Sequence, residues 1–146
     1  MGISVRTPGG GGEKGVGHIL EHAVLSGSRH FAQKEPFQEA VKRSVATYAN
    51  ASTKPDETVI QIVSPSPKDL RNLLAVVLDG IFFPNILSDK RILMKEGWRY
   101  EIDVEKEAIT GMNGIVYNEM KGRERDISHL RSVGMLRGLF PDCHLN

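Results

Sequence analysis

The spacing of hydrophobic and polar residues predicts a chain built from both helices and strands. Apolar positions that recur every three or four residues predict helices, whereas alternation bounded by turn residues predicts strands. The expected helices cover residues 15–26, 35–46, 66–82, 88–95, 115–121 and 126–139. The expected strands cover residues 3–6, 48–52, 58–63 and 98–104. This mixture, with two strands joined by a short turn, favours the α+β class: a two-layer α/β sandwich with a largely antiparallel sheet and helices on one face.

Turn-forming and capping residues set the boundaries of these elements. Ser66 followed by Pro67 is a typical helix start, because the serine caps the first turn and proline fits the first helical position. Pro84 ends the same helix, since proline cannot continue it. The glycine run at residues 9–12 predicts a flexible loop ahead of the first helix, and residues 54–56 predict the turn between the two adjacent strands.

Composition and charge narrow the class of protein. The chain has 146 residues, of which 40% are hydrophobic and 25% charged, as in an ordinary globular domain and unlike a disordered tail. The 19 basic and 18 acidic side chains nearly cancel, so the bulk charge indicates neither a nucleic-acid partner nor an anionic membrane surface. No apolar run approaches the roughly 20 residues of a membrane helix. The single cysteine, Cys143, excludes a scaffold built on internal disulfides.

The strongest chemical signal is the H-x-x-E-H pattern that His18, Glu21 and His22 form on the first expected helix. Histidines four residues apart lie on the same helix face, so both imidazoles can reach one metal ion. Zinc (Zn²⁺) suits this set, and Glu21 is close enough to hold a water and take its proton as a general base. The pattern is the inverzincin signature. With five histidines in the chain, chance gives roughly 0.01 matches.

Two histidines leave such a metal in need of a third protein ligand. Five downstream carboxylates qualify by residue type: Glu96, Glu101, Glu105, Glu107 and Glu119. The apolar neighbours of Glu119 predict a packed helix, whereas the charged neighbours of Glu105 predict a solvated turn. Spacing alone leaves the choice open.

Several segments, in order over nearly the whole chain, carry a resemblance to a known family. They are residues 6–8 (RTP), 15–22 (GVGHILEH), 26–29 (SGSR), 34–37 (KEPF), 96–101 (EGWRYE), 118–122 (NEMKG) and 139–142 (LFPD). These segments are similar to those of the pitrilysin (insulinase-type) zinc metallopeptidases, and most closely to the presequence protease branch. The resemblance implies that Glu119 is the third zinc ligand beside His18 and His22. It also implies that residues 1–146 form a single, truncated, N-terminal metallopeptidase domain, and it favours a mitochondrion or plastid as the compartment.

The same resemblance implies a substrate-binding strand at Asn50, Ala51 and Ser52. In the family, an Asn-Ala edge strand pairs with the backbone of the peptide substrate and orients the scissile bond over the metal. Such strand addition tolerates many substrate side chains, because the backbone supplies most of the hydrogen bonds. Ser52 stands where the family has an aromatic residue, so a pocket contact is altered there. The alternative is that Asn50 is only a strand-end or turn-forming residue.

Three functions follow from these observations. The leading one is a zinc-dependent metalloendopeptidase that hydrolyses unstructured peptides through a zinc-activated water. A lyase of the S-ribosylhomocysteine type shares the motif but uses two cysteines, so the single Cys143 excludes it. The third is a non-catalytic zinc-binding or interaction fragment of a larger peptidase.

The third function rests on what the resemblance implies for full-length members. They are several times longer, close two halves around the peptide, and draw from the second half an Arg/Tyr pair that polarises the scissile carbonyl. Losing such an electrophile typically costs about 10²–10³ in rate. We therefore expect peptide substrates, a missing C-terminal half or a partner chain, and zinc binding with weak or no cleavage by this chain alone.

Overall fold

The chain folds into helices packed on a small sheet, with a separate hairpin. The computed structural model describes residues 1–7, 15–54 and 56–141. Its helices are α1 (Val16–Val24), α2 (Pro36–Lys42), α3 (Pro67–Phe82), the short 3-10 helix η1 (Asn85–Leu87), α4 (Lys90–Glu96), α5 (Ile115–Arg123) and α6 (Ile127–Leu139). Its strands are β1 (Gly2–Arg6), β2 (Tyr48–Thr53), β3 (Glu57–Val63), β4 (Arg99–Asp103) and β5 (Ala108–Asn113). The glycine run at 9–12, Pro55 and Cys143 lie outside the described residues.

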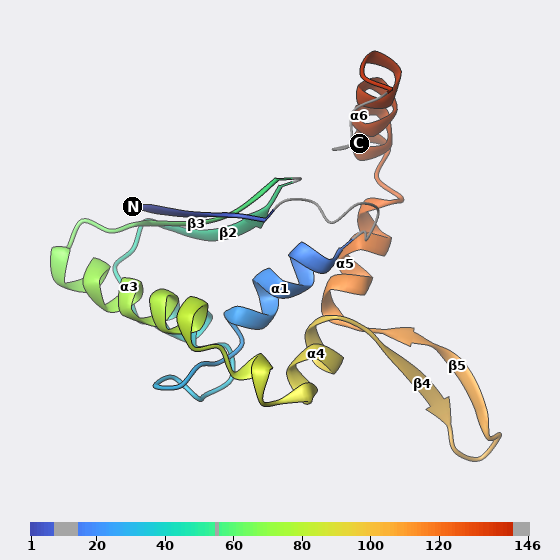
Figure 1. The fold of residues 1–146 in the computed structure, drawn as a ribbon, viewed down its shortest axis with the longest axis horizontal. Coiled ribbons are helices and arrows are strands. Elements are labelled where there is room, and N and C mark those ends of the chain that lie inside the picture. Colours follow the sequence, from blue (N-terminus) through green and yellow to red (C-terminus); the bar gives the residue numbers. More distant parts are fainter. Residues whose placement is uncertain (8–14, 55, 142–146) are drawn as a thin grey trace.

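The core lies between a three-stranded antiparallel sheet and the helices on one of its faces. The strand order is β1-β3-β2, so β3 is central and β2 lies at an edge. Along β3, Ile60 and Ile62 are buried while Gln61 between them is exposed, as the two-residue period of a strand requires. The buried core cluster consists of Phe37, Ile60, Ile62, Leu73, Val76 and Val77. Figure 1 shows α1 and α3 on the same side of this sheet, and the expected α+β fold is confirmed.

Helix α3 begins and ends where the sequence signals predict. The Oγ of Ser66 accepts a hydrogen bond from the backbone N–H of Asp69, which satisfies one of the free donors of the first turn. Leu73 and Val77, one turn apart, are buried against the sheet. The helix stops at Phe82, ahead of Pro84.

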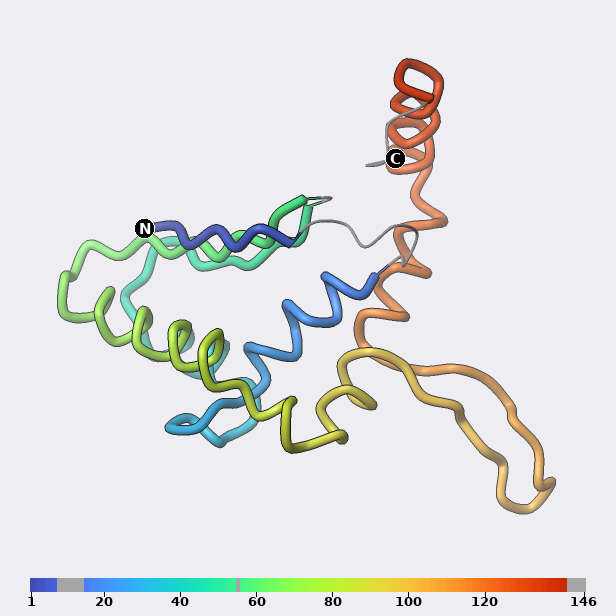
Figure 2. The backbone as a smooth tube through the Cα atoms, in the orientation of Figure 1, coloured from blue at the N-terminus to red at the C-terminus, as the bar shows by residue number. Residues whose placement is uncertain are grey.

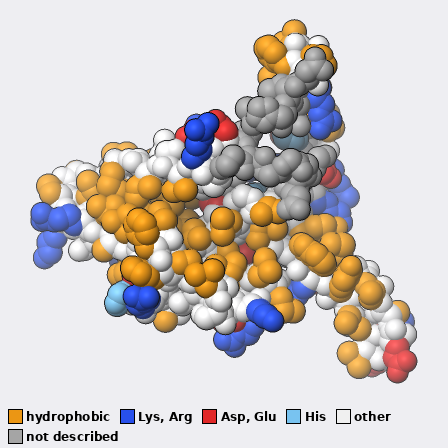
Figure 3. Space-filling model, in the orientation of Figure 1, with side chains coloured by type: hydrophobic (Ala, Val, Ile, Leu, Met, Phe, Trp, Pro, Cys, Tyr) orange, Lys and Arg blue, Asp and Glu red, His pale blue; other side chains and the backbone are white. Residues whose placement is uncertain are grey.

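The β4–β5 hairpin and α6 project away from this core, as the course of the backbone in Figures 1 and 2 shows. The strand β5 is an addition to the predicted elements. Its sequence, AITGMN, contains a glycine, and its first three side chains in a row are exposed, so it lacks the alternation of a half-buried strand. Apolar side chains remain exposed along the hairpin, among them Tyr100, Ile102 and Ile109 (Figure 3).

No described residue of α6 is buried, so this helix contributes no residue to the buried core of the described ranges. The helices of residues 1–7, 15–54 and 56–141 all lack the length and apolar content that crossing a membrane demands.

Candidate metal centre

Helix α1 carries the H-x-x-E-H residues in one regular turn of helix. It starts after Gly15, whose φ of 94° lies in the left-handed region that glycine adopts without strain. The N–H of Ile19 donates to the carbonyl of Gly15 at 2.8 Å, so the first turn is closed. His18 and His22 follow on the same face, and their ring centroids are 4.9 Å apart. Their imidazoles therefore reach the same region of space.

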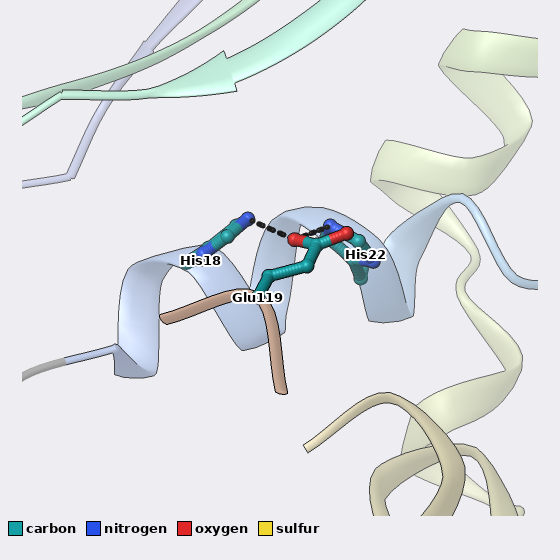
Figure 4. Close-up of side chains that lie close together, drawn as sticks. All are labelled: His18, His22 and Glu119. Carbon is teal, nitrogen blue, oxygen red and sulfur yellow. Dashed lines mark ion pairs between the residues drawn. The ribbon is translucent and has the colours of Figure 1, made fainter. Parts of the chain in front are cut away.

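Glu119 on α5 joins the two histidines to form a group of three candidate metal ligands, and Figure 4 shows its carboxylate reaching between them. Its Oε2 lies 3.3 Å from Nε2 of His18 and 3.6 Å from Nε2 of His22. A tetrahedral metal with donors at about 2.0–2.1 Å holds those donors about 3.3–3.4 Å apart, close to the two distances seen here. Within the described residues this is the only such group whose ligand atoms all lie within 4.8 Å of one another.

The electrostatics of His18 suit a metal ligand. Burial, together with the neighbouring His22, lowers the pKa of His18 below its ordinary value. A lowered pKa keeps the imidazole neutral near neutral pH, and the neutral form is the one that binds a metal.

Glu96, the last residue of α4, holds His22 through the ring nitrogen that does not face Glu119. Its Oε2 lies 3.3 Å from Nδ1 of His22, and its Oε1 accepts from Oγ of Ser26 at 2.8 Å and pairs with Nζ of Lys95 at 3.0 Å. Burial alone would raise the pKa of this carboxyl, but the hydrogen bonds from His22, Ser26 and Lys95 outweigh it and hold the pKa at about 2. The hydrogen bond to Glu96 also raises the pKa of His22. With Nδ1 engaged in this way, Nε2 of His22 is the nitrogen left to face Glu119.

The five carboxylates that the sequence left open are thus separated by the fold. Glu119 contacts both histidines, and Glu96 contacts the outer nitrogen of one of them. Glu101, Glu105 and Glu107 are exposed on the hairpin and belong to no ligand group. Sequence reasoning named Glu96 only as a candidate metal ligand and missed its contact with Nδ1 of His22. The available signal was its place in the 96–101 segment of family resemblance.

Glu21 points into the protein and is held by a residue that the sequence did not single out. The side chain of Glu21 is buried, with 7% of the residue exposed. Oγ1 of Thr53, the last residue of β2, donates a hydrogen bond to Oε2 of Glu21 at 2.5 Å. This contact ties the edge strand to α1 beside the two histidines. No local pattern marks Thr53, because its partner lies on a different element.

The strand that contains Asn50, Ala51 and Ser52 is an edge strand, with β3 as its partner in the sheet. Ala51 lies opposite Ile60 on the helix-facing side, whereas Asn50 and Ser52 belong to the other face. A cavity of about 370 Å³ opens between this strand and α1. Its lining includes Glu21, His22, Ala49, Asn50, Ala51 and Glu96, but not Ser52.

Matches to a family model and to several proteins relate the chain to known proteins. The family model described as Insulinase (Peptidase family M16) matches residues 11–117. Protein HypA of Clostridium perfringens (strain 13 / Type A) is 51% identical over 140 residues, which cover 96% of this chain and 14% of HypA. Presequence protease 1, chloroplastic/mitochondrial, of Arabidopsis thaliana is 46% identical over 122 residues, covering 84% of this chain and 11% of that protein. The mitochondrial presequence protease of Drosophila melanogaster is 39% identical over 130 residues, covering 88% and 12%.

A solved structure agrees with these sequence matches. The crystal structure of pitrilysin superposes with a TM-score of 0.52 at 28% identity, over 62% of this chain and 10% of the pitrilysin chain. The chain therefore spans only a small part of each relative's length. Because the family model covers most of the chain and the pitrilysin structure shares its fold, the chain belongs to the insulinase family of peptidases, family M16.

Proposed function

We propose that this chain is the metal-bearing part of a zinc-dependent endopeptidase. The observation that carries the proposal is the approach of Glu119 to both His18 and His22, with Glu21 on the same helix turn. Two imidazoles and one carboxylate, with a fourth position open, are the donor set of catalytic zinc sites. The family assignment supports a peptidase, and the donor set supports zinc as its metal.

Each residue of the motif has a defined role in this proposal. Zinc, when bound, acts as a Lewis acid that brings the pKa of water close to 7. His18, His22 and Glu119 hold the ion, and Glu96 fixes the orientation of the His22 ring through Nδ1. Glu21 accepts a proton from the attacking water as the general base. Thr53 donates to Oε2 of Glu21 and so sets the direction of its carboxylate.

The proposed substrate is a peptide in an extended conformation. A strand at the edge of a sheet offers free backbone N–H and C=O groups, to which an extended peptide can add. The β2 edge, with Asn50, Ala51 and Ser52, runs alongside α1. Glu21 and His22 line the cavity of about 370 Å³ between the strand and the helix. A peptide on this edge would therefore pass beside the candidate metal ligands. Unstructured peptides are the expected class, because they adopt the extended conformation without first having to unfold.

The second candidate function is a zinc-binding fragment that cleaves no peptide by itself. The observation that favours it is the share of each relative that the chain spans, 10–14%. The exposed apolar side chains on the hairpin agree with a surface that further protein normally covers. In this case the remainder of a larger peptidase, or a partner chain, supplies the missing electrophile.

Zinc content and peptide cleavage, measured on the same samples, test the proposal. We expect the wild-type chain to bind one zinc ion and to cleave an unstructured peptide weakly or not at all. Glu119→Gln should lose zinc, because an amide is a poor replacement for the carboxylate donor. Glu21→Gln should keep zinc and lose any cleavage, because the amide cannot accept the proton.

Two results would count against the proposal. Full zinc occupancy in Glu119→Gln contradicts the third-ligand assignment. Unchanged cleavage in Glu21→Gln contradicts the assignment of the general base. Brisk cleavage by the wild-type chain would instead remove the second candidate function.

A further inference from the structure

The two carboxylates that touch His22 come from helices on either side of the β4–β5 hairpin. Glu96 is the last residue of α4, and Glu119 lies on α5. A glycine stands at each junction with the hairpin: Gly97 directly follows α4, and Gly114 directly precedes α5. Both glycines are buried. The contacts between these two junctions therefore set the relative positions of Glu96 and Glu119.

The backbones of the two glycines touch. A Cβ atom placed on Gly114 would lie 2.0 Å from the carbonyl oxygen of Gly97 and 2.7 Å from Cα of Trp98. Such separations are far below any van der Waals contact, and the atoms concerned are backbone atoms that cannot rotate aside. Glycine at 114 is thus what allows the two chain segments to cross this closely. The crossing closes the base of the hairpin, so the part of the hairpin beyond this base does not determine how far α5 lies from α4.

Helix α5 contacts α1 and α4 on one side, where Met120 lies against Gly15. Val116 is its only buried residue in the described structure, and Glu119 itself is about half exposed, at 46% of its side chain. Near the helix start, Nδ2 of Asn118 donates to Oδ1 of Asn113 at 2.8 Å, and Nδ2 of Asn113 donates to Oε1 of Glu101 at 2.6 Å. The junction at the hairpin base, together with the buried Val116, therefore anchors the first turn of α5.

We propose that the backbone contact between Gly97 and Gly114 is the positioning element that brings Glu119 to coordinating distance of His18 and His22. The inference rests on the proposed zinc centre and adds a residue, Gly114, that touches neither metal nor substrate. Gly114 acts through Glu119: a side chain at this position moves the start of α5, and the carboxylate moves with it.

Metal affinity of the Gly114→Ala variant is the direct test. Zinc affinity is measured by competition with a chromogenic chelator, and the visible spectrum of the Co²⁺ form reports the ligand set. We expect Gly114→Ala to weaken zinc binding by about 10–100-fold, as changes around metal ligands typically do. The matched control is Gly122→Ala on the same helix, where an added Cβ meets nothing within 4 Å. Its affinity should equal that of the wild type.

A double-mutant cycle separates positioning from a general loss of structure. If Gly114 acts through Glu119, then adding Gly114→Ala to Glu119→Ala leaves the already weakened affinity within about twofold. A further large loss in that background overturns the inference, because Gly114 then acts on the histidines or on the whole fold. Wild-type affinity in Gly114→Ala overturns it as well.

A second variant keeps the inference testable if Gly114→Ala does not fold. Asn113→Ala removes the hydrogen bonds to Asn118 and Glu101 at the same junction without adding an atom. We expect it to weaken zinc binding by several-fold, whereas Thr110→Ala, which removes a hydrogen bond further along the hairpin, should leave affinity unchanged. Equal affinities in these two variants overturn the inference.

The outcomes distinguish this inference from the proposed zinc centre. If the wild-type chain binds no zinc, the zinc centre fails and the inference fails with it. If the wild type binds zinc and Glu119→Ala binds it more weakly, the centre stands, and the Gly114 and Asn113 variants then decide the inference alone.

Discussion

At the scale of single residues, Glu96 is a buried charge next to the candidate metal ligand His22. It is 3% exposed and yet ionised, because His22, Ser26 and Lys95 all hydrogen-bond to its carboxylate. Its pKa in the folded chain is about 2, below the ordinary value of 4.5. A lowered folded pKa means that ionised Glu96 stabilises the fold at all pH values above about 4.5, and that this stabilisation is lost as the pH falls toward 2.

The variant Glu96→Gln tests this charge. It should lower the free energy of unfolding at about pH 6 by about 1–3 kcal/mol, because charge-assisted hydrogen bonds to a buried carboxylate are lost. It should also shrink the loss of stability between about pH 6 and about pH 3. The measurement is urea denaturation of the metal-free chain at both pH values. Glu105→Gln, an exposed change on the hairpin, is the control and should behave as wild type. An unchanged pH dependence in Glu96→Gln would contradict the assignment.

Thr53 gives a second prediction at this scale. Thr53→Val keeps the shape of the side chain but removes the donor to Oε2 of the buried Glu21. We expect the free energy of unfolding to fall by about 1–3 kcal/mol, because a buried carboxylate is left with one partner fewer. Thr47→Val, whose hydroxyl is exposed, should change it by less than about 0.5 kcal/mol. Equal stabilities for the two variants would show that the Thr53 contact contributes nothing.

At the scale of elements, the β4–β5 hairpin is an insertion between two helices that already touch. Its turn at residues 104–107 includes Glu107 at a positive φ of 48°, a conformation that most side chains avoid. The strands on either side pair Asp103 with Ala108, so a two-residue turn can join them directly. The hairpin is therefore a natural place to change the length of the chain without moving α4 or α5.

Replacing residues 104–107 by Asn-Gly tests this independence. Asn-Gly favours the type I′ turn that suits a two-residue hairpin loop. We expect zinc affinity to stay within about twofold of wild type, because Gly97 and Gly114 meet at the base of the hairpin and not at its tip. Isothermal titration with zinc provides the measurement. A tenfold weaker affinity would indicate that the outer hairpin, and not its base, places α5.

At the scale of the whole molecule, the candidate metal ligands join the core to its periphery. His18 and His22 lie on α1, which contacts the sheet through Thr53, whereas Glu119 lies on α5, where Val116 is the only buried residue among those described. A metal held by both helices stabilises the folded chain, since it binds ligands that are far apart in the unfolded chain.

Metal removal should therefore destabilise the chain. With free zinc at about 100 times its Kd, the free energy of unfolding should be about 2.7 kcal/mol higher than in chelator. Hydrogen exchange should show the gain in protection concentrated in α5. A variant carrying both His18→Ala and His22→Ala is the control, and its stability should not respond to zinc. Equal stabilisation of wild type and control would show that zinc binds elsewhere.

Much of the fold could be predicted because its signals are local. The cap at Ser66, the stop at Pro84 and the alternation around Ile60 and Ile62 lie within a few residues of the elements that they define. The strand β5 escaped prediction because its exposed surface and Gly111 leave no alternating pattern. Hydrogen bonding to β4 forms this strand, and that partner is not visible in the local sequence.

The candidate site also combines features that local sequence signals predict with contacts that only the tertiary structure creates. The sequence by itself determined that His18, Glu21 and His22 share one turn of helix, because spacings of three and four residues have a fixed meaning on a helix. Family resemblance, not spacing, favoured Glu119 over the other carboxylates. Only the tertiary structure decided that Glu119 meets both histidines, that Glu96 holds His22 from its other nitrogen, and that Thr53 binds Glu21. These contacts join residues of different elements, and their geometry depends on how α4 and α5 cross at Gly97 and Gly114, which no local pattern encodes.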